Sequence, residues 1–426
     1  MKVIKYICAI FLCLTFECTA GFRLIRDAEI ETLLLEMVRP IFKVSGLRED
    51  AARVFIIDSD TMNAFTIGNG YIFVYTGLLL RLDSMQLMGV LAHETAHIAA
   101  GHINRLMAVL QNRSRNFTGA MMAGLLASIV TRSEKPMAMM MGYLMADERF
   151  FLHYSRGEEF AADALGASFL EKMGYGSQCM VSLLQKFQNF EIMNPGANMP
   201  EYIMSHPKLT ERISALRKRP QNFSKQLTND FQERYRLGIS KIRAYKKNYQ
   251  GDEYAKAICL HKVGNNTASI KILQDLSSKN PRNIFYKETL AQFLYEAGRL
   301  KDSVQLYKQI YESTPRDKLH PLIQISYAEV LIAANQDLNT AVKILETIKL
   351  KEYFDENIYR LLANAYGKQK HLGLSYLMSA NEKMLMGDYL TAEELIKLSL
   401  ANFDKNRDKN YIEQAEYLQE LISRKK

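Results

Sequence analysis

The sequence predicts a mostly α-helical protein in which an α+β domain with a small β-sheet is followed by an all-α superhelix of repeated helix pairs. Three observations support this. Short apolar runs typical of strands lie before residue 78. Helix-forming residues dominate after residue 220, with few glycines and prolines. Within that part, Pro281 and Pro315, like Gly264 and Gly298, lie 34 residues apart, which is the period of a common two-helix repeat.

The amino-terminal elements follow from the spacing of their apolar residues. We expect a helix over 27–45, a strand over 53–58, two short strands within 63–77 and a helix from residue 82 onward. Asp27 and Ser84 are the candidate helix caps. Residues 116–150 are rich in Met, Ala and Gly and predict a pair of helices. Their apolar runs are too short to cross a bilayer, and whether they touch lipid is open.

The first twenty residues differ from the rest of the chain. Two lysines precede a short apolar core, and small residues follow at a cleavage point after Ala20. This pattern predicts a secretory signal peptide over residues 1–20, and therefore an exported protein. A lipoprotein signal ending at Cys18 is the alternative, but Phe16 and Glu17 fit such a signal poorly.

Composition places the chain among folded globular proteins, with 48% hydrophobic and 24% charged residues. Its length of 426 residues predicts two or three domains. The net charge of +9 is spread along the chain, which favours a solvated surface over peripheral attraction to an anionic membrane, and we expect no nucleic-acid binding. Cys179 and Cys259 remain after signal cleavage, and two buried thiols are favoured over one disulfide.

The clearest repeat is LAQFLYEAGRLKDSVQLYKQIYESTP, residues 290–315, where Gly298 joins two helices and a proline closes the unit. It resembles the tetratricopeptide repeat, which stacks into a superhelix with a concave protein-binding face. A generic helical bundle is the alternative. The predicted division is a signal peptide (1–20), a first domain (21–220), a helical linker (221–250) and the repeat domain (251–426).

The segment HETAHIAAGH, residues 93–102, predicts a metal site. His93 and His97 are four apart, so both project from one helix face and can bind one tetrahedral zinc ion. Glu94 lies about 100° round the helix. It can reach a water molecule at the metal rather than the metal itself, and can act as general base. We expect one zinc ion per chain.

A catalytic zinc needs a third protein ligand. His102 lies about 140° from His97 around a continuous helix. It would therefore point away from the metal unless the helix unwinds, and we expect a packed or outer polar residue there.

The favoured third ligand lies in SRGEEFAADALGASF, residues 155–169. Glu159 and Asp163 are again four apart and share a face of a second helix. Glu159 can supply the carboxylate, and Asp163 can accept a hydrogen bond from the outer nitrogen of a ligating histidine, most simply His93. Glu158 is the alternative ligand, but it would lose the spacing to Asp163.

Four segments together resemble the zinc metalloprotease family that includes HtpX and the CAAX prenyl endoproteases. They are NAFTIGNGYIFVYTGLL (63–79), HETAHIAAGH (93–102), SRGEEFAAD (155–163) and SHPKLTERI (205–213). With the signal peptide and the repeats, the chain is similar to the periplasmic BepA-type proteases. The resemblance implies a gluzincin-like fold with zinc bound by three side chains, a catalytic base and an outer aspartate. These are His93, His97 and Glu159 for zinc, Glu94 as base and Asp163 as the aspartate.

The resemblance also implies roles for a loop and a strand. His206, followed by Pro207, corresponds to a histidine that can occupy the open zinc position and hold the enzyme latent, and an imidazole there could otherwise stabilise the oxyanion. The strand from residue 71 to 75 resembles an edge strand. Tyr71, Ile72 and Phe73 are therefore predicted to pair with an extended substrate.

The sequence thus predicts an exported zinc endopeptidase. The resemblance implies that it acts in the periplasm and cleaves misfolded or misassembled outer-membrane and envelope proteins. Its repeats would dock the client or the outer-membrane assembly machinery. Two alternatives stay open. One is a chaperone or adaptor for outer-membrane protein assembly whose protease activity is latent. The other is a helical scaffold with a structural metal.

Overall fold

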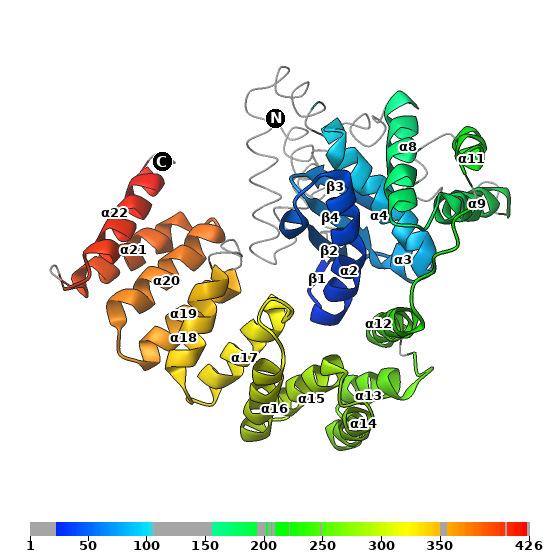
Figure 1. Cartoon of the computed structure of the whole chain (residues 1–426). Helices are drawn as coiled ribbons and strands as arrows, with labels where there is room; N and C mark the ends of the chain where they lie inside the picture. Colours follow the sequence, from blue (N-terminus) through cyan, green and yellow to red (C-terminus); the bar gives the residue numbers. More distant parts are fainter. Residues whose placement is uncertain are drawn as a thin grey trace, which may run out of the picture.

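The computed structural model describes residues 23–103, 105, 156–193, 202, 206, 209–220, 222–247, 249–349, 356–404 and 407–423. The predicted signal peptide, the Met-rich segment 116–150 and Pro207 lie outside these residues. The described chain is mostly helical with one small sheet, as the sequence predicts (Figure 1). Among the helices described, none has the length and apolar character that crossing a bilayer requires.

The amino-terminal unit is built on a helix and a four-stranded sheet. Helix α2 spans Ala28–Ser45, and the side chain of Asp27 caps it by accepting a hydrogen bond from the Ile30 amide at 3.0 Å, as predicted. The sheet has the order β1-β2-β4-β3, in which β2 and β4 run parallel. Its strands are β1 (Leu24–Ile25), β2 (Arg53–Ile57), β3 (Ala64–Gly68) and β4 (Tyr71–Tyr75), and the short helix η1 (Glu49–Ala51) precedes β2.

Strand β4 is an inner strand, so the prediction that it forms an edge is wrong. Phe73 pairs with Phe55 of β2 on one side and with Phe65 of β3 on the other. The backbone groups of Tyr71, Ile72 and Phe73 therefore belong to a strand that is bonded on both sides and cannot accept an extended substrate as a further strand. Within the described residues, β3 is the outer strand on this side of the sheet.

Helix α4 (Ser84–Ala99) follows the sheet through the short helix α3 (Thr76–Leu79). Its cap is Asp83, not Ser84 as predicted. The Asp83 carboxylate accepts from the Gln86 amide at 2.8 Å, and the Gln86 side chain accepts from the Asp83 amide at 3.3 Å. This reciprocal capping box fixes the start of α4. Helices α8 (Arg156–Lys172), α9 (Gln178–Met193) and α11 (Leu209–Arg217) are the further helices of this unit among the described residues.

Helix α12 (Asn229–Lys247) connects this unit to the rest of the chain. Phe231 and Tyr235 belong to the hydrophobic core of the amino-terminal unit, whereas Leu237 and Ala244 belong to a second core formed with the next helices. Because both its faces are buried in different cores, α12 packs as part of both units.

The remaining helices follow one another in an arc (Figure 1). They are α13 (Glu253–Lys262), α14 (Asn266–Lys279), α15 (Ile284–Glu296), α16 (Leu300–Ser313), α17 (Pro321–Ala333), α18 (Leu338–Lys349), α19 (Glu356–Lys368), α20 (Leu372–Leu385), α21 (Tyr389–Ala401) and α22 (Lys409–Ser423). The described residues of this arc contain no strand. Helix α17 lies against α2, so the arc returns to the amino-terminal unit.

The sequence period is visible as a repeated hydrogen bond. The Ser269 hydroxyl donates to the Ala257 carbonyl, and the Ser303 hydroxyl, 34 residues later, donates to the Ala291 carbonyl, both at 2.7 Å. Each bond joins the two helices of a pair at a point where a small residue lets them approach. At the turn that lacks glycine, Asn335 adopts a positive φ of 52° in its place.

The two cysteines of the described chain are both buried and free, as predicted. Cys179 lies in α9 and Cys259 in α13, so each packs in a different unit. Burial raises the pKa of the Cys179 thiol to about 11, which favours its neutral form.

A buried charged cluster holds the arc against the amino-terminal unit. The ammonium nitrogen of Lys241 on α12 lies 2.8 Å from Asp27 Oδ2 and 3.3 Å from Glu29 Oε2. The Tyr254 hydroxyl, from α13, donates to Glu29 Oε2 at 2.8 Å and also lies 2.8 Å from the Thr289 hydroxyl on α15. One cluster thus connects α2 with three later helices.

Replacing Lys241 by Met is expected to lower the free energy of unfolding by about 3–5 kcal/mol, because the buried carboxylate of Glu29 and the half-buried one of Asp27 lose the cation that balances them. Chemical denaturation followed by circular dichroism measures the change. Met at Lys247, which is exposed on the same helix, is the matched control and should change stability by no more than about 0.5 kcal/mol. Equal stability of the two variants would contradict the role given to the cluster.

Candidate metal centre

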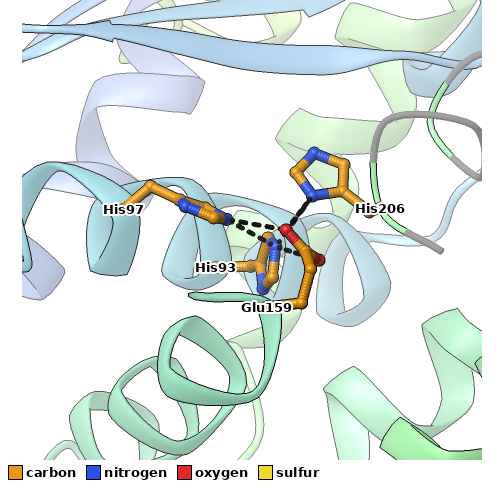
Figure 2. Close-up of side chains that lie close together, drawn as sticks. All are labelled: His93, His97, Glu159 and His206. Atoms are coloured by element: carbon orange, nitrogen blue, oxygen red, sulfur yellow. Dashed lines mark hydrogen bonds and ion pairs between the residues drawn. The ribbon is translucent and has the colours of Figure 1, made fainter. Parts of the chain in front are cut away.

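Helices α4 and α8 and the segment before α11 bring four side chains together (Figure 2). His93, His97, Glu159 and His206 each offer one ligand atom, and these atoms all lie within 4.8 Å of one another. All four residues are buried. The three side chains proposed as ligands from the sequence therefore converge, and His206 joins them.

Four of the separations between ligand atoms are close to the edges of a tetrahedron around one ion. His93 Nε2 lies 3.0 Å from His97 Nε2 and 3.2 Å from His206 Nδ1. Glu159 Oε1 lies 3.4 Å from His97 Nε2 and 2.9 Å from His206 Nδ1. Bonds of about 2.0–2.1 Å to a tetrahedral ion separate its ligand atoms by about 3.3–3.4 Å. The four side chains therefore fit one small divalent cation.

Two features of the local sequence create this convergence. The spacing of four places His93 and His97 on one face of α4. Glu159 lies on the side of α8 that faces them. Gly166 lets the two helices approach, because a Cβ atom there would lie 3.1 Å from the Ala92 carbonyl oxygen and 3.3 Å from the His93 amide nitrogen. We did not identify Gly166 from the sequence, and a glycine inside a helical pattern is the signal that could have pointed to it.

Asp163 lies where the sequence predicts it. Its Oδ1 is 3.0 Å from His93 Nδ1. Burial raises the pKa of Asp163, but Arg212 outweighs this and holds it down at about 2. The carboxylate is therefore ionised and accepts a hydrogen bond from His93 Nδ1–H, which leaves the lone pair of Nε2 directed at the centre.

Arg212 of α11 also belongs to the site, although no pattern in the sequence predicts a role for it. Its guanidinium donates to both oxygens of Asp163, at 2.6 and 2.8 Å, and to the carbonyl of His206 at 3.0 Å. Its Nη1 also lies 2.9 Å from Glu159 Oε2. Arg212 is buried, and its bond to the His206 carbonyl holds that residue against the centre.

Glu94 lies beside the ligand group without belonging to it. Its carboxylate is fully buried and accepts no hydrogen bond within the described part of the chain. Oε1 lies 3.5 Å from His206 Nε2. Burial raises the pKa of Glu94 to about 8. A carboxyl group with such a pKa can both accept and release a proton near neutral pH.

The two alternative ligands that the sequence offers, His102 and Glu158, lie outside the ligand group. His102 Nδ1 is 2.8 Å from Nδ1 of His97, on the side of that ring opposite Nε2. Glu158 Oε1 lies 3.7 Å from Arg105 at the margin of the site. The geometry therefore favours Glu159 over Glu158 as a candidate ligand and places His102 behind the ring of His97.

Comparison with known proteins agrees with this geometry. The model of peptidase family M48 matches residues 25–220. The chain is 23% identical to the beta-barrel assembly-enhancing protease of Yersinia pestis over 344 residues, which cover 74% of this chain and 68% of the relative. With the protein of that name from Escherichia coli (strain K12), it is 22% identical over 334 residues, 73% of this chain and 66% of the relative.

A second group of relatives matches only the amino-terminal part. The chain is 31% identical to Protease HtpX of Xanthomonas oryzae pv. oryzae (strain PXO99A) over 215 residues, which cover 44% of this chain and 72% of the relative. The chain spans about two thirds of the length of the beta-barrel assembly-enhancing proteases that it matches.

Proposed function

This chain belongs to peptidase family M48 and is a metalloprotease, and on that premise we propose that it is a periplasmic zinc endopeptidase that cleaves misfolded or misassembled outer-membrane and envelope proteins. The observation that carries this proposal is the group of four buried ligand atoms within 4.8 Å of one another, beside the carboxylate of Glu94.

The ligand chemistry supports zinc. Two imidazoles and one carboxylate, contributed by His93, His97 and Glu159, form a common set for catalytic zinc. Calcium and magnesium prefer oxygen ligands alone. When bound, zinc supplies Lewis-acid catalysis by polarising the scissile carbonyl.

The remaining residues supply proton transfer and positioning. Glu94 takes the proton of the attacking water and passes it to the leaving nitrogen, for which its burial and raised pKa suit it. Asp163 and Arg212 hold the ring of His93 and the backbone of His206 in place. For the substrate, we assign the pairing role to β3. Its outer edge is unpaired within the described residues, and it packs against α4, which carries His93 and His97.

The helical arc is the part that we propose docks a client or the outer-membrane assembly machinery. Its 34-residue hydrogen-bond repeat supports stacked tetratricopeptide-like pairs, which present a concave surface to proteins. The names of the beta-barrel assembly-enhancing proteases support a role in the assembly of β-barrel proteins. The chaperone or adaptor with a latent protease is the second candidate, because the position of His206 favours a latent state.

His206 is proposed to be a latch. Its Nδ1 lies among the ligand atoms, and its Nε2 faces Glu94. The ring therefore fills the space between the metal ligands and the general base, where water and the scissile carbonyl would have to lie. Opening would require His206 to move away from the ligand group and from Arg212.

Casein degradation by the zinc-loaded chain tests these proposals. His206→Ala is expected to cleave casein at least about tenfold faster than the wild type. The reason is that the latch leaves about a tenth of the wild-type molecules or fewer in the open state, whereas all molecules of the variant are open. Chelation should abolish cleavage in both, and added zinc should restore it. His371→Ala, at an exposed position of the arc, should behave as the wild type.

Two results would contradict this account in different ways. Slower cleavage by His206→Ala would replace the latch with a role in stabilising the oxyanion. Absence of cleavage by the wild type and by His206→Ala, with zinc bound to both, would support a scaffold with a structural metal instead of an endopeptidase.

A further inference from the structure

The two histidines of α4 have different partners behind their rings. His93 Nδ1 faces the carboxylate of Asp163, whereas His97 Nδ1 faces the Nδ1 of His102 at 2.8 Å. The rings of His97 and His102 have their centroids 4.9 Å apart and are nearly perpendicular, with an interplanar angle of 70°. Both residues are buried.

A change of backbone direction brings His102 to this position. Helix α4 ends at Ala99, and Gly101 adopts a positive φ of 66°. On a continuous helix, His102 would lie about 140° round from His97. The left-handed residue ends the helix between them and turns the chain, so that the His102 ring lies against the outer side of the His97 ring. A Cβ atom on Gly101 would meet its nearest neighbour only at 3.9 Å. Glycine is therefore favoured by the backbone angle rather than by lack of space.

The contact determines where the protons lie. Two imidazole nitrogens 2.8 Å apart must share one hydrogen between them. The Nε2 of His97 faces His93 Nε2 and Glu159 Oε1, so metal binding requires its lone pair there and its hydrogen on Nδ1. His102 Nδ1 must then be the acceptor, and His102 carries its own hydrogen on Nε2.

A neutral hydrogen-bond acceptor such as the His102 imidazole suits the position behind His97. The charge of Asp163 behind His93 is balanced by Arg212, which donates to both of its oxygens. A second carboxylate behind His97 would add a buried negative charge close to Glu159. An imidazole accepts the hydrogen bond without that charge.

We propose that His102 is a positioning residue that fixes the tautomer and orientation of His97, and that the turn at Gly101 places it there. This inference rests on the proposed zinc site. It assigns His102 no contact with metal or substrate.

Nuclear magnetic resonance of the zinc-loaded wild type, labelled with ¹⁵N at histidine, reads the tautomers directly from long-range couplings. We expect the hydrogen of His97 on Nδ1 and that of His102 on Nε2. A hydrogen on Nδ1 of His102 would overturn the proposal, and this measurement needs no variant.

Zinc affinity, measured by competition with a chelator, provides the second readout. His102→Phe is expected to weaken zinc binding about 10- to 100-fold, and His102→Gln, whose amide oxygen can accept the hydrogen bond, to recover most of the loss. Gly101→Ala should also weaken binding. Gly387→Ala, at a helix end with a φ of 77° and equally open space, is its matched control and should leave zinc affinity unchanged.

The outcomes separate this inference from the proposed function. If the wild type binds zinc and His102→Phe binds it equally well, the role of His102 is wrong and the zinc site stands. If the wild type binds no zinc, both are wrong.

Discussion

Replacing Glu94 by Gln is expected to slow peptide hydrolysis about 10²- to 10⁴-fold, the range that general acid–base catalysis contributes, while the chain keeps its zinc. Glutamine preserves the shape of the side chain but cannot accept a proton. Because Glu94 lies outside the group of ligand atoms, its loss removes no metal ligand. The test compares the turnover number for casein of the Glu94→Gln, His206→Ala double variant with that of His206→Ala alone. In this background the latch does not limit the rate.

Glu158→Gln is the control for that experiment. It makes the same chemical change on a glutamate that pairs with Arg105 at the margin of the site, and it should leave turnover unchanged. Turnover of Glu94→Gln within a few-fold of its parent would contradict the role of Glu94 as the general base. Complementation in cells addresses the rival function, because full rescue by Glu94→Gln would favour the adaptor.

The part of the site that the sequence predicts is the part that lies on single helices. A spacing of four determines that His93 shares a face with His97, and Glu159 with Asp163, whatever the rest of the chain does. The hydrogen bond between Asp163 and His93 follows once the two helices face each other, and the structure confirms that geometry.

Contacts that depend on tertiary structure could not be predicted in this way. The bidentate bond of Arg212 to Asp163 spans 49 positions of the chain. The contact of His102 with His97 depends on one left-handed residue that ends a helix. Neither leaves a periodic pattern in the sequence.

The wrong prediction that residues 71–75 form an edge strand has a similar cause. An apolar run such as residues 71–75 identifies a buried strand, but strand order depends on pairing between segments. Here β4 pairs in parallel with β2 although β3 lies between them in the sequence, so β3 becomes the outer strand. The helical arc was easier to predict, because the pattern of each helix is local and several of its turns carry a glycine or a substitute such as Asn335.

The second large effect is expected from Glu159→Gln, which should lose most of its zinc and its peptidase activity. Although burial raises the pKa of Glu159, the neighbouring His206 and His93 lower it well below its usual value, so the group is a carboxylate. It supplies the negative charge within the ligand group, and a neutral amide of the same shape cannot replace that charge next to a divalent cation.

Metal content of purified chains, measured by mass spectrometry after dialysis against a weak chelator, is the most direct test of the claim that one ion joins α4 to α8. We predict about one zinc ion per chain in the wild type, in Glu94→Gln and in Glu158→Gln, and little or none in Glu159→Gln. A full complement of zinc in Glu159→Gln, or a wild type without zinc, would contradict it.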